Sequence, residues 1–195
     1  MKRLISLLIV ICLLLTTAVG CGEQPEITED GNIENGEGGE GTNDEEEPLP
    51  EVGNSVGMLF PGINIETLAG GSVNPDDYRG KIVVINIWAT WCGPCKAELP
   101  DFDKIASDYA DDVVIIAAHD YYGRENAPQY VETNFPDTNI IFAYDNSFSS
   151  VFLAIGGTRY VPMTAVLDQR GVIVYSDSGL MTYEQLEAII LGLLN

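Results

Sequence analysis

A pair of cysteines two residues apart, Cys92 and Cys95, stands between a predicted buried strand and a predicted helix. Residues 82–88 read Ile-Val-Val-Ile-Asn-Ile-Trp, a nearly continuous apolar run typical of a central strand. After the cysteines, apolar residues repeat with the spacing of one helix face: Phe102, Ile105, Ala106 and Tyr109. A reactive pair at the junction of a strand and a helix constrains the fold more than any other feature of this chain.

The position of the pair indicates thiol-disulfide chemistry. A helix N-terminus carries partial positive charge and unpaired N–H groups, both of which favour a thiolate over a thiol. Cys92, at or before the helix start, gains most and is predicted to be the nucleophile. Cys95, one turn further on, is predicted to resolve the mixed disulfide. Pro94 fits the first helical turn, where its missing N–H is harmless.

The remaining cysteines do not extend this site. The chain has four cysteines: Cys12 lies within an N-terminal apolar run and Cys21 directly follows it. A zinc site would need two more ligands, and the chain has only one histidine, His119. We therefore expect no metal and no bound cofactor, and the Cys92–Cys95 pair itself would carry the electrons.

The N-terminus has the layout of an export signal. Lys2 and Arg3 precede an apolar stretch over 4–15, and small residues lead to Gly20 and Cys21. The stretch is short for a membrane span. A cysteine directly after the cleavage position favours lipidation, so residues 1–20 are predicted to be a lipoprotein signal peptide. The alternatives are an uncleaved anchor, or plain secretion in which Cys21 is incidental.

An acidic segment follows the presumed lipid site. Residues 22–51 hold 12 of the 30 acidic residues and no Lys or Arg, with little to bury. Such a composition predicts an extended, disordered linker, so we assign 21–51 to the lipidated cysteine and its linker and 52–195 to the folded domain. With only 9 Lys and Arg in the chain, nucleic-acid binding is excluded as an expected function.

The folded domain alternates predicted strands and helices. Short strands are expected within 58–73 around a Gly70-Gly71 turn. Strands and helices then alternate over 113–118, 126–134, 139–144 and 147–155. A strand hairpin is expected over 164–175. Thr182 and Gln185 form a capping box for a last helix that ends near Leu194. This order predicts an α/β fold with a mixed sheet flanked by helices.

The stretch from Asn86 to Pro100, Asn-Ile-Trp-Ala-Thr-Trp-Cys-Gly-Pro-Cys-Lys-Ala-Glu-Leu-Pro, resembles the active-site segment of the thioredoxin superfamily. It is most similar to the membrane-bound TlpA/ResA-like thiol-disulfide oxidoreductases. Further matches are Arg79-Gly80-Lys81, Val161-Pro162 and the segment 164–168 with Gly171. The resemblance covers about 52–195. It implies a thioredoxin fold with an N-terminal strand extension and a central αβ insertion near 126–144.

The resemblance also implies roles for individual residues. Pro162 would follow a cis bond and face the cysteine pair, while the backbone of Val161 would pair with an extended substrate. Asn86 occupies the place of the buried Asp of thioredoxins and cannot accept a proton. Glu98 would instead tune the thiols or relay a proton. The alternative interpretation makes Glu98 a solvated first-turn residue favoured by the helix dipole.

The aromatic neighbours of the pair are expected to have different roles. Trp88 should pack beneath the site, and Trp91 should flank Cys92 on the docking surface. With Gly93, Pro94 and Val161, Trp91 completes the predicted substrate-binding set. His119 follows a predicted strand, and we expect it to be a loop residue without a catalytic role.

The expected function is reduction of disulfides in exported proteins such as apocytochrome c, by a monomer anchored through lipid on the extracytoplasmic face of the membrane. A membrane donor of the thiol-disulfide type would supply its electrons. Gly-Pro between the cysteines is the dipeptide of reducing thioredoxins. Three alternatives remain: a disulfide-forming oxidase, a peroxiredoxin-like peroxidase, and a lipid-anchored binding module without catalysis. The peroxidase is disfavoured because Pro-x-x-x-Thr-x-x-Cys is missing, and the binding module because Cys92 and Cys95 are intact.

Overall fold

The fold is built on one seven-stranded sheet in the order β2-β1-β5-β4-β3-β6-β7. A computed structural model describes residues 48–157 and 160–195. The predicted signal peptide, Cys21 and the linker up to residue 47 therefore lie outside the described residues. The strands are β1 Ile65–Thr67, β2 Ser72–Val73, β3 Ile82–Trp88, β4 Val113–His119, β5 Ile141–Tyr144, β6 Met163–Leu167 and β7 Ile173–Ser178.

Strand β3 lies inside the sheet, and every one of its residues is buried. It pairs in parallel with β4 and antiparallel with β6, so the sheet is mixed as predicted. In this register Asn86 lies opposite Ala117 on one side and Thr164 on the other. The end of β3, just before the cysteines, is therefore held on both sides.

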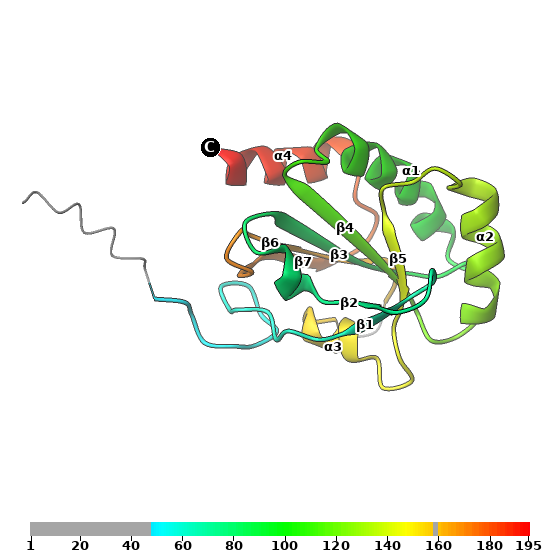
Figure 1. The fold of residues 1–195 in the computed structure, drawn as a ribbon, viewed down its shortest axis with the longest axis horizontal. Coiled ribbons are helices and arrows are strands. Elements are labelled where there is room, and N and C mark those ends of the chain that lie inside the picture. Colours follow the sequence, from blue (N-terminus) through cyan, green and yellow to red (C-terminus); the bar gives the residue numbers. More distant parts are fainter. Residues whose placement is uncertain (1–47, 158–159) are drawn as a thin grey trace, which may run out of the picture. The chain divides into compact units, whose positions relative to one another are not determined.

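Helices cover both faces of the sheet (Figure 1). The elements are α1 Gly93–Asp108, α2 Ala127–Asn134, α3 Ser150–Ala154 and α4 Tyr183–Leu194, with short 3-10 turns at Pro75–Tyr78 and Arg124–Asn126. Side chains from α1, α2 and α4 share a core with Ile82, Val84 and Trp88. Those of α3 pack instead with Val83 and Ile85. Successive side chains of β3 point to opposite faces of the sheet, so this strand contributes to the core on both faces.

The predicted α/β architecture is confirmed. The hairpin β1–β2 turns at Gly70 and Gly71, which both have positive φ. Helix α2 and strand β5 form the central insertion, and β5 joins β4 to β1. Helix α4 begins at the predicted capping box, in which the Thr182 side chain accepts from Gln185 N–H and the Gln185 side chain accepts from Thr182 N–H.

Two local predictions differ from the structure. The helix expected from residue 147 begins only at Ser150, because the Asp145 carboxylate accepts hydrogen bonds from Val151 N and Phe152 N at 3.0 and 3.2 Å. His119 is not a loop residue: it is the last residue of β4 and is fully buried. Both outcomes depend on contacts that the local pattern does not contain.

None of the helices in the part of the chain that the structure describes has the length and apolar character needed to cross a bilayer.

Candidate active site

The cysteine pair forms a disulfide at the start of α1. Cys92 is the N-cap residue with an extended backbone, and its Sγ accepts a hydrogen bond of 3.1 Å from Cys95 N. Pro94 lies in the first turn, as predicted. An N-cap position directs unpaired N–H groups at the cap side chain. The same N–H group would stabilise a Cys92 thiolate once the disulfide is reduced.

The two sulfur-bearing residues differ in their access to solvent. Cys92 retains 5% of its surface, whereas Cys95 retains none. Gly93 and Pro94 between them are exposed. The difference supports the prediction that Cys92 is attacked and attacks first, because a substrate sulfur cannot reach Cys95 without displacing its cover.

The Val161-Pro162 peptide bond is cis, as the resemblance implied. Pro162 directly precedes β6, the antiparallel neighbour of β3, and is buried. Val161 is half-buried and packs against the core cluster that contains both cysteines. Because β6 runs antiparallel to β3, the two residues lie at the same end of the sheet as the start of α1. Their predicted part in substrate binding stays a prediction.

Glu98 is fully buried, so the interpretation of it as a solvated residue is wrong. It lies three residues after Cys95, on the same face of α1. Its Oε1 accepts from Asn86 Nδ2 at 2.9 Å, and its Oε2 accepts from Met181 N at 3.0 Å. Burial nevertheless raises the pKa of Glu98 from 4.5 to about 7, against the opposing effect of both hydrogen bonds. A carboxyl group with this pKa can exchange protons at neutral pH.

Asn86 connects Glu98 to β6. Its Nδ2 also lies 3.0 Å from Thr164 Oγ1, whereas its buried Oδ1 has no partner among the described residues. Rotating the amide by half a turn would present Oδ1 to Glu98. Asn86 can therefore donate to an ionised Glu98 carboxylate or accept from a protonated one.

Trp88 is buried and Trp91 is exposed, as predicted, whereas the predicted part of Trp91 in docking stays a prediction. Trp88 is fully buried, belongs to the core cluster with both cysteines, and donates from Nε1 to Ala117 O at 3.3 Å. Trp91 is 60% exposed, and its Nε1 donates to Tyr122 O at 3.1 Å. The sequence did not predict the contact with Tyr122, which is 31 residues away.

His119 holds the turn that leads to Cys92, a role that sequence reasoning missed. Its Nε2 lies 2.9 Å from Thr90 N, and its Nδ1 lies 2.6 Å from Asp120 O. Because Thr90 N–H must donate and Asp120 C=O must accept, the ring is neutral with its proton on Nδ1. Burial lowers the pKa of His119, which agrees with the neutral form. The available signal was that the only histidine of the chain directly follows a predicted buried strand.

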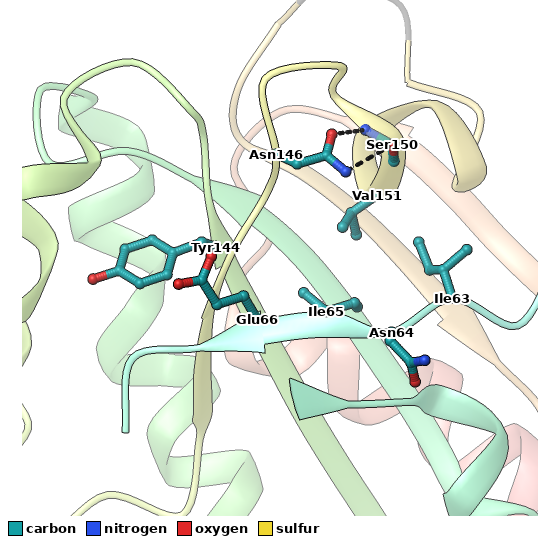
Figure 2. A pocket seen from close by; sticks show the side chains of 8 residues that line it. All are labelled: Ile63, Asn64, Ile65, Glu66, Tyr144, Asn146, Ser150 and Val151. Carbon is teal, nitrogen blue, oxygen red and sulfur yellow. Dashed lines mark hydrogen bonds between the residues drawn. The ribbon is translucent and has the colours of Figure 1, made fainter. Parts of the chain in front are cut away.

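The described residues form a cavity away from the cysteine pair, and they form no metal site. No three His, Cys, Asp or Glu among them gather closely enough to hold a metal ion. The cavity, of about 260 Å³, lies between β1 and the loop that leads into α3 (Figure 2). None of its lining residues belongs to the cysteine site, and its Asn146 carboxamide is bonded to Ser150. It has no evident part in thiol chemistry.

Comparison with known proteins agrees with this geometry. Residues 55–190 match the Redoxin family. The chain is 33% identical over 142 residues to the thioredoxin-like protein YneN of Bacillus subtilis, covering 70% of this chain and 79% of that one. It is 28% identical over 138 residues to the thiol-disulfide oxidoreductase ResA of Bacillus thuringiensis subsp. konkukian, covering 68% and 75% of the two chains.

Solved structures show the same fold. The pneumococcal exposed lipoprotein thioredoxin Etrx1 of Streptococcus pneumoniae superposes with a TM-score of 0.59 at 25% identity, over 68% of this chain and 100% of that one. A secreted thiol-disulfide isomerase of Corynebacterium glutamicum superposes with a TM-score of 0.62 at 25% identity, over 70% and 85% of the two chains. The chain belongs to the redoxin family, and within the thioredoxin superfamily it is a ResA-like thiol-disulfide oxidoreductase.

Proposed function

We propose that this protein reduces disulfides of exported proteins at the outer face of the membrane. The observation that carries the proposal is the Cys92–Cys95 pair at the start of α1, with the more accessible sulfur bonded to a helix N–H. The Gly-Pro dipeptide between the cysteines supports the reducing direction. The ResA relatives and the lipoprotein thioredoxin among the similar structures support an extracytoplasmic site of action.

The proposed reaction is a two-step exchange. The Cys92 thiolate attacks one sulfur of the substrate disulfide, forming a mixed disulfide and releasing a substrate thiolate. Cys95, after losing its proton, then attacks Cys92 Sγ. This step forms the Cys92–Cys95 disulfide and releases the second substrate thiol. Two electrons pass to the substrate, whose two sulfurs take up one proton that originates on Cys95 and one from solvent. A membrane dithiol donor would return the pair to its reduced form.

Glu98 is proposed to serve the second step. Cys95 is buried and must become a thiolate inside the core, where a charge is costly. Glu98 lies one helical turn away, with a pKa of about 7. Near neutral pH about half of the Glu98 carboxyl groups would be ionised and able to accept the Cys95 proton. After resolution Glu98 would release this proton to solvent or to the departing substrate thiolate.

The location is proposed from the N-terminal sequence. A lipid on Cys21 would anchor the chain, and the acidic segment that follows would act as a tether for the domain at 52–195. The family resemblance suggests apocytochrome c or another exported protein as the substrate. We propose that the protein acts as a monomer.

Reduction of insulin tests the function directly. The pre-reduced full chain should cleave insulin disulfides and lose two free thiols for each disulfide cleaved. Cys92→Ser should abolish the reaction, whereas Lys104→Ala, a change on the exposed side of α1, should leave it unchanged. If the reduced wild-type chain does not cleave insulin, the reducing function is wrong.

A further inference from the structure

Three exposed aromatic residues lie on the turn before Cys92 and on the loop after β4, two segments that a hydrogen bond joins. Trp91, which directly precedes Cys92, contacts the loop after β4 through its hydrogen bond to Tyr122 O. The Tyr121 and Tyr122 rings pack edge to face with centroids 5.6 Å apart. These three side chains, the aromatic ridge, are 60%, 41% and 73% exposed. A single exposed aromatic residue is ordinary, but three on adjoining segments indicate an interaction surface.

The backbone beneath the ridge is fixed from both sides. His119 accepts from Thr90 N, and Asp120 N donates to Trp88 O at 2.8 Å. These bonds tie the start of the β4–α2 loop to the turn that carries Trp91 and Cys92. A surface that is already ordered loses little entropy when it binds a partner.

The far end of the same loop is also anchored. Arg124 donates to Glu66 at 2.9 Å and lies over the Tyr144 ring at 4.0 Å. Gly123 adopts a φ of +78°, and a side chain there would come within 3.4 Å of Trp91 Cδ1. The loop is therefore held against the indole, so the tyrosines project from a supported position.

A shallow hollow without charged side chains adjoins the ridge. It measures about 290 Å³ and is lined by Thr90, Asn126, Gln129, Tyr130, Thr133 and Asn134. All of these side chains are uncharged, although the segment 52–195 carries 18 acidic and seven basic residues. Amide and hydroxyl groups without net charge suit the N–H and C=O groups of an extended peptide rather than an ion.

We propose that the aromatic ridge docks the segment of a substrate polypeptide that flanks its disulfide, with an apolar side chain against Tyr122 and the peptide backbone over the adjoining hollow. This inference rests on the proposed function and names the class of substrate. Cys92 retains only 5% of its surface and directly follows the exposed Trp91, so a substrate chain whose sulfur reaches Cys92 comes close to the indole. Tyr and Trp side chains are the residues that most often dominate the energetics of such contacts.

The test compares a polypeptide disulfide with a small one. The pre-reduced full chain is reacted with insulin and with bis(2-hydroxyethyl) disulfide, and loss of free thiols is followed by rapid alkylation and mass spectrometry. Tyr122→Ala should slow the second-order reaction with insulin by about tenfold, the size expected for loss of a dominant contact. It should change the rate with the small disulfide by less than about twofold and leave the reduction potential unchanged. Leu191→Ala, an exposed apolar change on α4, serves as the matched control and should alter neither rate.

The outcomes separate docking from chemistry and from self-association. Equal slowing of both disulfides would show that Tyr122 acts on the reactive pair, and no slowing of either would show that the ridge binds nothing; both overturn the proposal. A dimer in sedimentation that Tyr122→Ala abolishes would assign the ridge to a second copy and also overturn it. If the wild-type chain reduces neither disulfide, the reducing function fails. In that case the oxidised chain is reacted with reduced insulin chains and with 2-mercaptoethanol. The proposal then requires Tyr122→Ala to slow the reaction with the insulin chains about tenfold and the reaction with 2-mercaptoethanol by less than about twofold, and any other result overturns it.

Discussion

Asn86 Nδ2 donates a hydrogen bond of 2.9 Å to Glu98 Oε1 inside the core, next to the helix turn that carries Cys95. The pair joins the central strand to the helix of the reactive cysteines. The buried Glu98 carboxyl has a pKa of about 7. The Asn86 Oδ1 has no partner among the described residues, and it can accept a hydrogen bond from Glu98 once Glu98 is protonated. The polar core is therefore compatible with both charge states of Glu98.

Glu98 should make stability fall as pH rises through neutrality. The folded pKa of about 7 exceeds the unfolded value of 4.5, so the folded state holds a proton that the unfolded chain has lost. Its favourable contribution is complete below about pH 4.5 and disappears as pH passes about 7. The shift corresponds to about 3 kcal/mol. Urea unfolding of wild type and Glu98→Gln at several pH values should show this loss only in the wild type.

The Glu98→Gln variant is a fair control because its amide can be accommodated. The carboxamide oxygen introduced there can accept from Met181 N, and Asn86 Oδ1, once rotated, can accept from the new amide N–H. Glu98→Gln should also shift the pH dependence of Cys92 or Cys95 alkylation. If stability depends on pH in the same way in wild type and Glu98→Gln, and the alkylation profiles are also unchanged, Glu98 does not tune the thiols.

His119 should have the opposite pH dependence. Burial lowers the pKa of His119; Asp120 and Glu125 oppose this shift, and Arg124 adds to it. The neutral ring in the folded state therefore contributes stability above about pH 6.5, the ordinary pKa of histidine. That stability is lost as pH falls through the lowered folded pKa, because a protonated ring cannot accept from Thr90 N. His119→Gln should abolish this acid-side loss, since glutamine does not titrate.

Replacing His119 with a residue that cannot accept a hydrogen bond should lower the stability of the fold further. His119→Leu leaves Thr90 N–H and Asp120 C=O without their partner and should destabilise the fold by about 1–3 kcal/mol at about pH 7.5. The glutamine variant should recover much of that loss through its own acceptor. Equal stability of the leucine and wild-type chains at that pH would show that the Thr90–His119 hydrogen bond contributes little.

The cysteine roles can be separated by trapping. Cys95→Ser removes the resolving thiol, so Cys92 should accumulate as mixed disulfides with exported proteins, visible after acid quenching on non-reducing gels. Cys92→Ser should trap none, because Cys95 is fully buried. Adducts found with Cys92→Ser instead would reverse the assignment of attacking and resolving thiols.

Anchoring is tested independently of the redox chemistry. Mass spectrometry of the mature chain should find Cys21 at the N-terminus, carrying lipid, and carbonate washing should leave the protein on the membrane. Cys21→Ala should lose the lipid label and give an uncleaved precursor or soluble protein. An unmodified wild-type N-terminus beyond Cys21 would disprove the lipid anchor and leave the Cys92–Cys95 chemistry unaffected.

Features that depend on a few consecutive residues were predictable. The apolar run that forms β3, the N-cap position of Cys92 and the capping box at Thr182 all depend on neighbours within one turn or strand. The family resemblance added the cis bond before Pro162. The sequence also nominated Glu98, although it could not decide between burial and solvent.

Features that depend on distant contacts were not predictable from the sequence. The Glu98 carboxylate accepts from Met181 N, 83 residues further along the chain. The role of His119 requires Thr90, 29 residues earlier, and the aromatic ridge requires Tyr122 to reach Trp91. The Thr90–His119 and Trp91–Tyr122 contacts form only when the sheet brings the ends of β3 and β4 together, and the Glu98–Met181 contact only when α1 packs beside α4. No local spacing encodes any of them.

The reduction potential of the Cys92–Cys95 pair tests the central claim most directly. The full chain is equilibrated in thiol-disulfide buffers of graded potential and quenched with alkylating agent, and the oxidised fraction is read by mass spectrometry. A protein that donates electrons to substrate disulfides should give a midpoint close to that of thioredoxin, about −270 mV. A midpoint near about −120 mV, typical of a strong disulfide-forming oxidant, would contradict the reducing function.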